Sequence, residues 1–243
     1  MRIKVINPNT SRAMTATIRE AATGVVAPGT VIEAVSPAMG PESIESHYDE
    51  ALSVPGVLDE VAAGERDGAD GYVIACFGDP GLDAAREVAR GPVVGIAEAA
   101  MRTAVHLGHR FSVVTTLSRT RGHTWDLAER YGVAKFCRGV HACDIPVLEL
   151  DTHPDTTRKL LEACRTALRV DDSDVLVLGC AGMTPLATRT SARLGVPVVD
   201  GVQAAVLTVQ SLLRMGLTTG LRGAFAAPPP KPYTGLLRGF GSA

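Results

Sequence analysis

The chain has 243 residues, 46% of them hydrophobic and 21% charged, which is enough apolar material for one large domain or two small ones. A formal net charge of −2 argues against a nucleic-acid-binding protein or a membrane-surface protein. No apolar run approaches the roughly 20 residues that a membrane-spanning helix needs. The first nine residues are typical of a strand and turn, not of a signal peptide.

The first half of the chain alternates short apolar runs with amphipathic stretches, which predicts strands joined by helices. The expected strands are 2–6, 30–35, 72–75 and 92–95, and the expected helices are 11–23, 53–66, one starting near 79, and 96–107. Residues 36–46 form a long polar loop with two prolines. Loops of this length in compact domains are usually functional or mobile.

One stretch of this half, Ala69 to Gly81, carries the first chemical signal. Residues 72–75 are apolar without polar alternation, as expected of a parallel strand covered on both faces, and Cys76 ends that strand. Asp79 is a good helix cap, and Pro80 suits the first helical position. We therefore expect the Cys76 sulfur at the carboxyl end of a strand, beside the amides of a helix N-terminus, where open α/β sheets bind ligands.

The second half repeats this plan about a hundred residues later. Expected strands are 111–116, 136–140, one ending before Cys180, and 197–200, with helices at 119–131, 154–170, one starting near 184, and 202–215. Ser173 to Pro185 has the same order of parts as the Cys76 stretch, with Thr184 in the place of the cap. Alternating strands and helices predict parallel sheets, and the internal repeat predicts two similar lobes.

The fold expected from this pattern is α/β, with two flavodoxin-like lobes related by a pseudo-twofold axis. The first lobe is expected at 1–97 and the second at 98–201, each contributing one strand-end cysteine to an active site in the cleft between them. Residues 224–243, which include Pro-Pro-Pro-Lys-Pro-Tyr, are expected to form a C-terminal tail.

The remaining cysteines and histidines lack a recognisable pattern. Five cysteines without a CxxC pair favour free thiols in a reducing cytoplasm. Cys164 falls on the apolar face of a predicted helix, and Cys137 and Cys143 lack the strand-end context. Nucleotide-phosphate, HExxH and GxSxG motifs are absent and the six histidines are scattered, so neither a metal nor an organic cofactor is expected.

Each of these candidates also has a purely structural interpretation. A cysteine at a buried strand end is often just a small core residue, and a duplication can copy an inert residue twice. Cys76 and Cys180 together, each followed by small residues and a helix start, favour chemistry instead. The polar candidates are also ordinary turn, strand-end and loop residues: Asn9, Ser43, Ser46, Thr115 and Thr116.

Seven segments, in order along the chain to about Met215, resemble the aspartate/glutamate/hydantoin racemase superfamily, most closely its hydantoin/allantoin racemase branch. They are 5–10, 40–45, 75–82, 92–96, 111–116, 178–183 and 197–201. Amino-acid racemases of this superfamily carry Cys-Asn-Thr and Cys-Thr after their two strands. Here Cys76-Phe-Gly-Asp and Cys180-Ala-Gly-Met stand instead, which points away from free aspartate or glutamate and towards a cyclic or ureido substrate.

The resemblance implies a cofactor-independent racemase that interconverts D and L 5-substituted hydantoins, or allantoin, by proton transfer between Cys76 and Cys180. Removing the hydrogen from carbon 5 gives a planar enolate, which a thiol on the other face can reprotonate. The helix starts after each cysteine are expected to lower the thiol pKa. The implied substrate-binding residues are Asn9, Ser43, Ile44, Phe77, Gly78, Asp79, Thr115, Thr116, Ala181, Gly182 and Met183.

The resemblance also implies that the helix at 202–216 packs back on the first lobe and that the protein is a homo-oligomer. Apolar tail residues such as Leu236, Leu237 and Phe240 could contribute to that association.

Rival interpretations come from the same superfamily and from outside it. Related decarboxylases retain one of the two cysteines, and maleate isomerases need a site for two carboxylates, for which no basic cluster is visible near either cysteine. Two further rivals are an amino-acid racemase and a non-catalytic small-molecule-binding protein.

Overall fold

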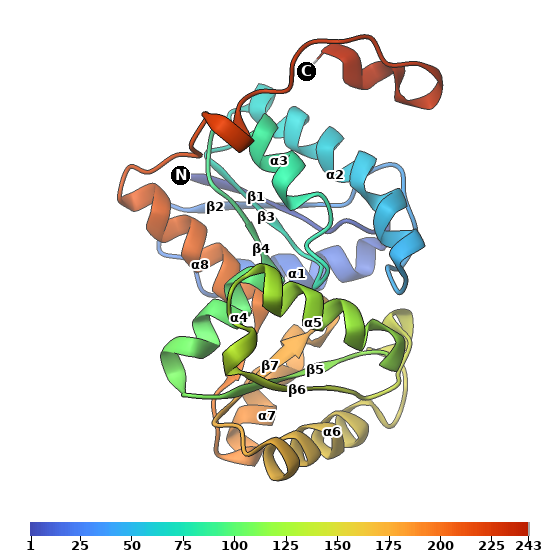
Figure 1. Ribbon diagram of the computed structural model, residues 1–243, viewed down its shortest axis with the longest axis vertical. Coiled ribbons are helices and arrows are strands. Elements are labelled where there is room, and N and C mark those ends of the chain that lie inside the picture. Colours follow the sequence, from blue (N-terminus) through green and yellow to red (C-terminus); the bar gives the residue numbers. More distant parts are fainter. Residues whose placement is uncertain (243) are drawn as a thin grey trace.

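The chain forms two lobes, each built on one parallel four-stranded sheet, in a computed structural model that describes residues 1–242 (Figure 1). The first sheet has the order β2-β1-β3-β4 and the second the order β6-β5-β7-β8. The strands are β1 Arg2–Ile6, β2 Val31–Val35, β3 Gly71–Ile74, β4 Val93–Gly95, β5 Phe111–Thr115, β6 Cys137–Ala142, β7 Val175–Gly179 and β8 Val198–Val199. Both sheets thus have the same strand order, beginning 2-1-3-4 as in flavodoxin-like folds, which confirms the predicted repeat.

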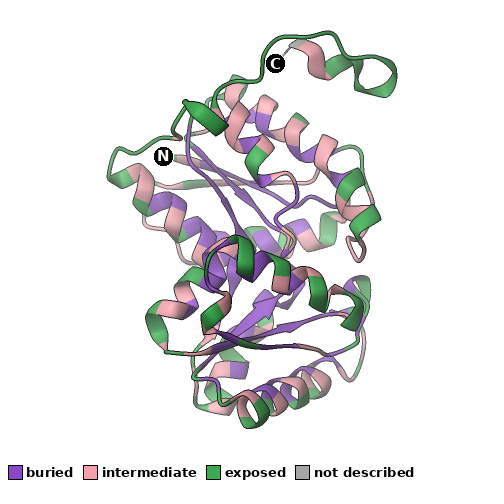
Figure 2. Ribbon diagram, in the orientation of Figure 1, coloured by how far each residue is buried: buried purple, intermediate pink, exposed green. Residues whose placement is uncertain are grey.

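Helices cover both faces of each sheet. They are α1 Arg12–Thr23, α2 His47–Asp67, α3 Leu82–Val88, α4 Ile96–Leu107, α5 Arg121–Arg130, α6 Thr156–Asp171, α7 Ala187–Leu194 and α8 Gly201–Arg214. The central strands β3, β5 and β7 are buried along their whole length and β1 is buried beyond its first residue (Figure 2), and Tyr72, Val73 and Ile74 of β3 have no exposed surface. This burial explains why β3 and β7 are continuous apolar runs in the sequence.

Two helices join the lobes. α8 packs against β3 and β4 of the first sheet and against α4, while α4 packs against β7 of the second sheet. The approach is close at Gly201, where a Cβ atom would lie 2.8 Å from the carbonyl oxygen of Ile96. The helix predicted at 202–216 therefore contacts the first sheet, and the predicted lobe boundary at residue 97 falls inside α4.

α2 begins six residues earlier than predicted, at His47 instead of Ser53. The Ser46 hydroxyl accepts a hydrogen bond from the Asp49 amide, and the Asp49 carboxylate accepts bonds from the Ser46 hydroxyl and the Glu45 amide. This reciprocal cap fixes the helix start in spite of Pro55 in the helix interior. The polar loop between β2 and α2 therefore covers residues 36–46, as predicted.

After α8 the chain runs back over the first lobe. The Thr219 hydroxyl donates to the carbonyl oxygen of Gly91 at 2.6 Å, and the Phe225 ring lies against the Arg86 guanidinium. The segment that was expected to form a C-terminal tail contains two 3₁₀ turns, Gly223–Phe225 and Gly235–Ser242, and the side chain of Leu236 is fully exposed. Among the described residues, none of the helices has the length and apolar content required to cross a bilayer.

Candidate active site

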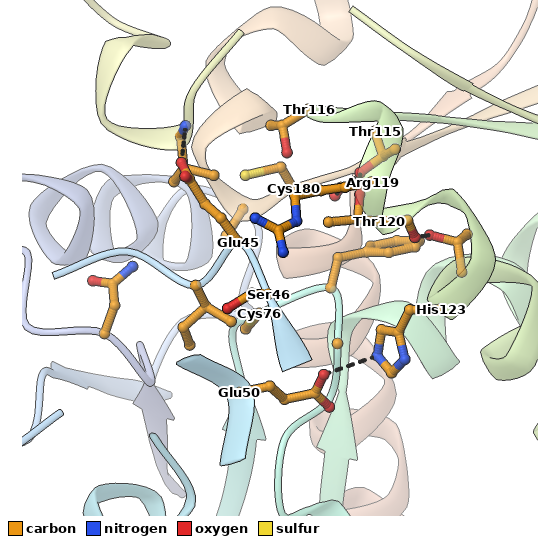
Figure 3. Close-up of a pocket in the computed structure, with 18 of the residues that line it drawn as sticks. Glu45, Ser46, Glu50, Cys76, Thr115, Thr116, Arg119, Thr120, His123 and Cys180 are labelled. Carbon is orange, nitrogen blue, oxygen red and sulfur yellow. Dashed lines mark hydrogen bonds and ion pairs between the residues drawn. The ribbon is translucent and has the colours of Figure 1, made fainter. Parts of the chain in front are cut away.

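A cavity of about 210 Å³ opens where the carboxyl ends of the central strands of both sheets meet (Figure 3). Asn9 comes from the turn after β1, and residues 75–78 follow β3. The second lobe contributes Thr115 and Thr116 from the end of β5 and residues 179–181 from the end of β7. Strand carboxyl ends at the point where the strand order reverses are the usual ligand sites of such sheets.

Two of the five cysteines reach this cavity. Cys76 and Cys180 line it and are partly exposed, whereas Cys137, Cys143 and Cys164 are buried. All five, which lie within residues 1–242, are free thiols. The positions of the two strand-end cysteines are therefore consistent with the distinction drawn from their sequence context.

Both cavity thiols are held mainly in the neutral form. Burial raises the pKa of Cys180 to about 12 and raises the pKa of Cys76 further above its usual range. The backbone amide of Gly78 acts in the opposite direction on Cys76, and the amides of Gly182 and Met183 do so on Cys180. Cys180 also contributes to the raised pKa of Cys76, which means that the two thiols interact electrostatically.

The prediction that a capped helix start lowers each thiol pKa is wrong. α3 begins only at Leu82, with Gly81 at its N-cap position and no side-chain cap. After Cys180 the chain makes a 3₁₀ turn over Ala181–Leu186 before α7 starts at Ala187. The sulfurs therefore interact with individual turn amides, and the effect of these amides on the thiol pKa is smaller than that of desolvation.

Asp79 has a different role from the two that the sequence suggested. Its carboxylate is buried and accepts hydrogen bonds from the amides of Ala97 and Glu98, at 3.0 and 2.9 Å, and from the Tyr131 hydroxyl at 2.6 Å. It therefore caps α4 and not the helix that follows Cys76, and it does not line the cavity. Burial raises its pKa to about 6 because these hydrogen bonds only partly offset desolvation.

The structure brings together most of the residues that were expected to bind substrate. Those that line the cavity with the two cysteines are Asn9, Ile44, Phe77, Gly78, Thr115, Thr116 and Ala181. Those outside its lining are Ser43, Asp79, Gly182 and Met183. Thr184, expected as a helix cap, instead donates to the Asp200 carboxylate at 2.6 Å.

Several cavity residues were not identified from the sequence. Arg119 and Thr120 come from the 3₁₀ turn after β5 and His123 from the first turn of α5, while Glu45 and Glu50 come from the start of α2 and the loop before it. The Arg119 guanidinium points into the cavity that both cysteines line (Figure 3). Arg119 and His123 could have been identified because they follow closely after a strand predicted to end at the cleft, where ligand-binding residues are expected.

Proteins of known family resemble the chain over nearly its whole length. The model of the Asp/Glu/Hydantoin racemase family matches residues 3–209. A hydantoin racemase of Rhizobium meliloti is 47% identical over 97% of this chain and 98% of its own, and one of Pseudomonas sp. (strain NS671) is 45% identical over 99% and 97%. The solved structure of an allantoin racemase from Klebsiella pneumoniae superposes with a TM-score of 0.97, at 50% identity and with full coverage of both chains.

The family match spans all the strands of both lobes and both cavity cysteines. The relatives match the chain over nearly its full length, so the similarity includes the cavity and the helices that join the lobes. The chain belongs to the Asp/Glu/hydantoin racemase family, as an enzyme of its hydantoin and allantoin racemase branch.

Proposed function

We propose that this enzyme interconverts the D and L forms of a 5-substituted hydantoin, or of allantoin, without a cofactor, using Cys76 and Cys180 as its two acid–base groups. The observation that carries the proposal is that these two thiols, one from each lobe, are the partly exposed cysteines and line one cavity. The relatives named hydantoin racemase and allantoin racemase supply the substrate class.

The reaction needs one proton removed and one added. The thiolate of one cysteine takes the hydrogen from carbon 5, and the electron pair of that C–H bond passes into the adjacent carbonyl group to form an enolate. The thiol of the other cysteine donates its proton to the opposite face of the planar carbon. The product has the other hand, and the two cysteines have exchanged protonation states.

The raised thiol pKa values fit this chemistry. A thiolate whose conjugate acid has a high pKa is a strong base, which a weakly acidic carbon requires, although little of it is present at neutral pH. The partner must remain a neutral thiol to act as the acid, and burial favours that form. Hydroxyls of Thr115 and Thr116 and the amide of Asn9 line the same cavity and supply hydrogen-bonding groups for the ring.

The composition of the cavity bears on the rival activities. A decarboxylase of this fold would use one cysteine, whereas two line the cavity here. A maleate isomerase would bind two carboxylates, whereas Arg119 is the single arginine or lysine among the described residues that line the cavity. A binding protein without catalysis would leave the carbon 5 hydrogen in place.

The test is proton NMR of each pure enantiomer in heavy water with Cys76→Ser and Cys180→Ser. Each variant should lose racemisation, because each lacks either the base or the opposed acid. The remaining thiolate can still exchange the hydrogen of the enantiomer that it faces, so the two variants should label opposite enantiomers. Cys164→Ala, which alters a buried cysteine of α6, is the matched control and should racemise normally.

Two results would contradict the proposal. Racemisation at a near wild-type rate in either single variant would exclude the two-cysteine mechanism, and labelling of the same enantiomer by both variants would exclude opposed faces. Because the proposed reaction uses only side chains and backbone amides, activity should also survive exhaustive chelation.

The proposal also includes the cellular compartment and the oligomeric state of the enzyme. Its five free cysteines fit a reducing cytoplasm. Association into a homo-oligomer, with the exposed Leu236 and Leu237 of the C-terminal segment at the contact, is part of the same proposal, and light scattering at micromolar concentration tests it.

A further inference from the structure

Three side chains with metal-binding atoms meet on the wall of the cavity: His47 and Glu50 from α2 and His123 from α5. One ligand atom from each lies within 4.8 Å of the other two. His123 Nε2 is 3.3 Å from a Glu50 carboxylate oxygen, and the two imidazole rings meet edge to face with their centroids 5.3 Å apart (Figure 3 shows the Glu50–His123 pair).

Local structure explains how these groups are presented. His47 and Glu50 are three residues apart in the first turn of α2, so their side chains lie on the same helix face. The reciprocal Ser46–Asp49 cap fixes that turn. His123 lies in the first turn of α5 in the other lobe and meets this pair across the cavity.

An ordinary ion pair between Glu50 and His123 explains this cluster incompletely. His123 Nε2 is buried and has no hydrogen-bond partner of acceptable geometry among residues 1–242, even though the Glu50 oxygen is close. A buried ring nitrogen without a partner is costly and therefore uncommon. A bound metal ion would give this nitrogen the partner that the described residues do not supply.

Two imidazoles and a carboxylate are the ligand set of a three-coordinate protein site for a divalent transition metal, with further positions left to water. Bond lengths of about 2.0–2.2 Å require the three ligand atoms to approach within about 4 Å. The Glu50–His123 pair, at 3.3 Å, already meets this requirement, and the ligand atom of His47 lies within 4.8 Å of both. His47 is exposed at the start of α2 and can complete the approach by a change of rotamer. The ligand types favour Zn²⁺ and neighbouring ions over Mg²⁺ or Ca²⁺.

We propose that His47, Glu50 and His123 form a binding site for a zinc-type divalent cation that bridges the two lobes at the wall of the catalytic cavity. The ion is not a reactant in racemisation. It ties α2 of the first lobe to α5 of the second, and it lies next to Gly78, where a Cβ atom would be 3.4 Å from both Glu50 and His123. A cation held there reduces the space beside Cys76 and resists separation of the lobes, so it should act as an inhibitor.

The test measures metal binding directly and uses Co²⁺ as the probe, because its absorption spectrum reports the ligands. The full-length Cys76→Ser/Cys180→Ser protein is used so that the cavity thiols cannot bind the metal. We expect one Co²⁺ per chain, with ligand-field bands and no sulfur-to-cobalt charge-transfer band. His47→Ala and His123→Ala should each weaken binding at least tenfold, whereas His106→Ala, an exposed histidine of α4, should not.

His47→Ala keeps the test valid if His123→Ala folds poorly, because His47 is exposed in the folded protein. Failure of the double serine variant to bind Co²⁺, or unchanged binding in His47→Ala, would overturn the proposal. Metal binding by wild type alone, with a sulfur charge-transfer band, would overturn it as well and assign the metal to the cysteines. Because binding is measured without turnover, these outcomes are independent of the proposed racemase reaction.

Discussion

Replacing Tyr131 by phenylalanine should destabilise the protein much more at pH 8 than at pH 5. The Tyr131 hydroxyl donates to the buried Asp79 carboxylate at 2.6 Å, and this bond connects α5 of the second lobe to the turn that follows Cys76. The pKa of Asp79 is about 6, so the carboxylate is charged at pH 8 and mostly neutral at pH 5. A hydrogen bond to a charged acceptor is worth more than one to a neutral acceptor.

The size of the loss of stability depends on whether the Asp79 carboxyl is charged or neutral. Loss of a hydrogen bond to a buried charge costs about 1.5–3 kcal/mol, whereas loss of a neutral one costs about 0.5–1.5 kcal/mol. Wild-type stability itself depends on pH here. Because folding raises the pKa of Asp79 from 3.8 to about 6, the folded protein binds this proton more tightly than the unfolded chain does. Ionisation of Asp79 therefore lowers the free energy of unfolding by about 3 kcal/mol as pH rises from about 4 to about 6. Tyr131→Phe removes a bond that lowers this pKa, so the decrease should extend to higher pH.

The assay is urea unfolding of wild type and Tyr131→Phe at several pH values from 5 to 8. Tyr72→Phe is the matched control, because Tyr72 also donates to a carboxylate, that of Glu65, at 2.7 Å but lies away from Asp79. Its effect should not follow the Asp79 titration. An equal loss of stability at pH 5 and pH 8 in Tyr131→Phe would refute the assignment of a raised pKa to Asp79.

Two further predictions concern the cavity. Because burial raises the pKa of both cavity thiols, inactivation by iodoacetamide should accelerate about tenfold per pH unit from pH 7 to 9. A plateau in the inactivation rate by pH 8 would contradict this prediction. Protection by substrate shows that the cavity thiols are the ones that react. Arg119→Met should raise the KM for allantoin about 10- to 100-fold and that for an alkyl-substituted hydantoin less, if the guanidinium binds the ureido substituent. Equal losses for both substrates would assign Arg119 to the ring instead.

The features predictable from sequence are those set by hydrophobic periodicity and by position on a strand. β3 and β7 are buried apolar runs of ordinary strand length, and each ends in a cysteine at the carboxyl edge of its own parallel sheet. The internal repeat predicted two similar lobes around one cleft, so the sequence was sufficient to expect Cys76 and Cys180 in the same cavity. The helix over Ile96–Leu107 was predicted with its observed bounds because its apolar spacing is regular.

The features that escaped prediction depend on contacts between distant parts of the chain. Glu50 and His123 meet only because α2 and α5 face each other across the cleft, and neither has a distinctive local pattern. Asp79 looked like a local helix cap because Pro80 follows it, but its φ of 47° turns the chain and directs the carboxylate to α4 instead. The sequence shows only which residues adjoin Asp79 in the chain, whereas the folded structure decides which amides its carboxylate reaches.

Both halves contain a buried carboxylate that bonds to the start of a helix, but the carboxylate comes from a different place in each half. In the first half the turn after Cys76 supplies the Asp79 carboxylate, and Gly95 at the end of β4 leaves room for it, since a side chain at Gly95 would overlap that carboxylate. In the second half the end of β8 is followed by Asp200, whose carboxylate accepts from the Gln203 amide and caps α8, while Thr184 in the turn after Cys180 donates to it.

In both halves a buried carboxylate therefore connects the turn after the cysteine to the start of the helix that packs between the lobes. The capped helices, α4 and α8, are the pair that holds the two sheets together. The position of each thiol is thus linked through one carboxylate to the relative position of the lobes. A two-base reaction requires the cysteines on both sides of one small ring, and this arrangement fixes each cysteine turn to the interface that sets their separation.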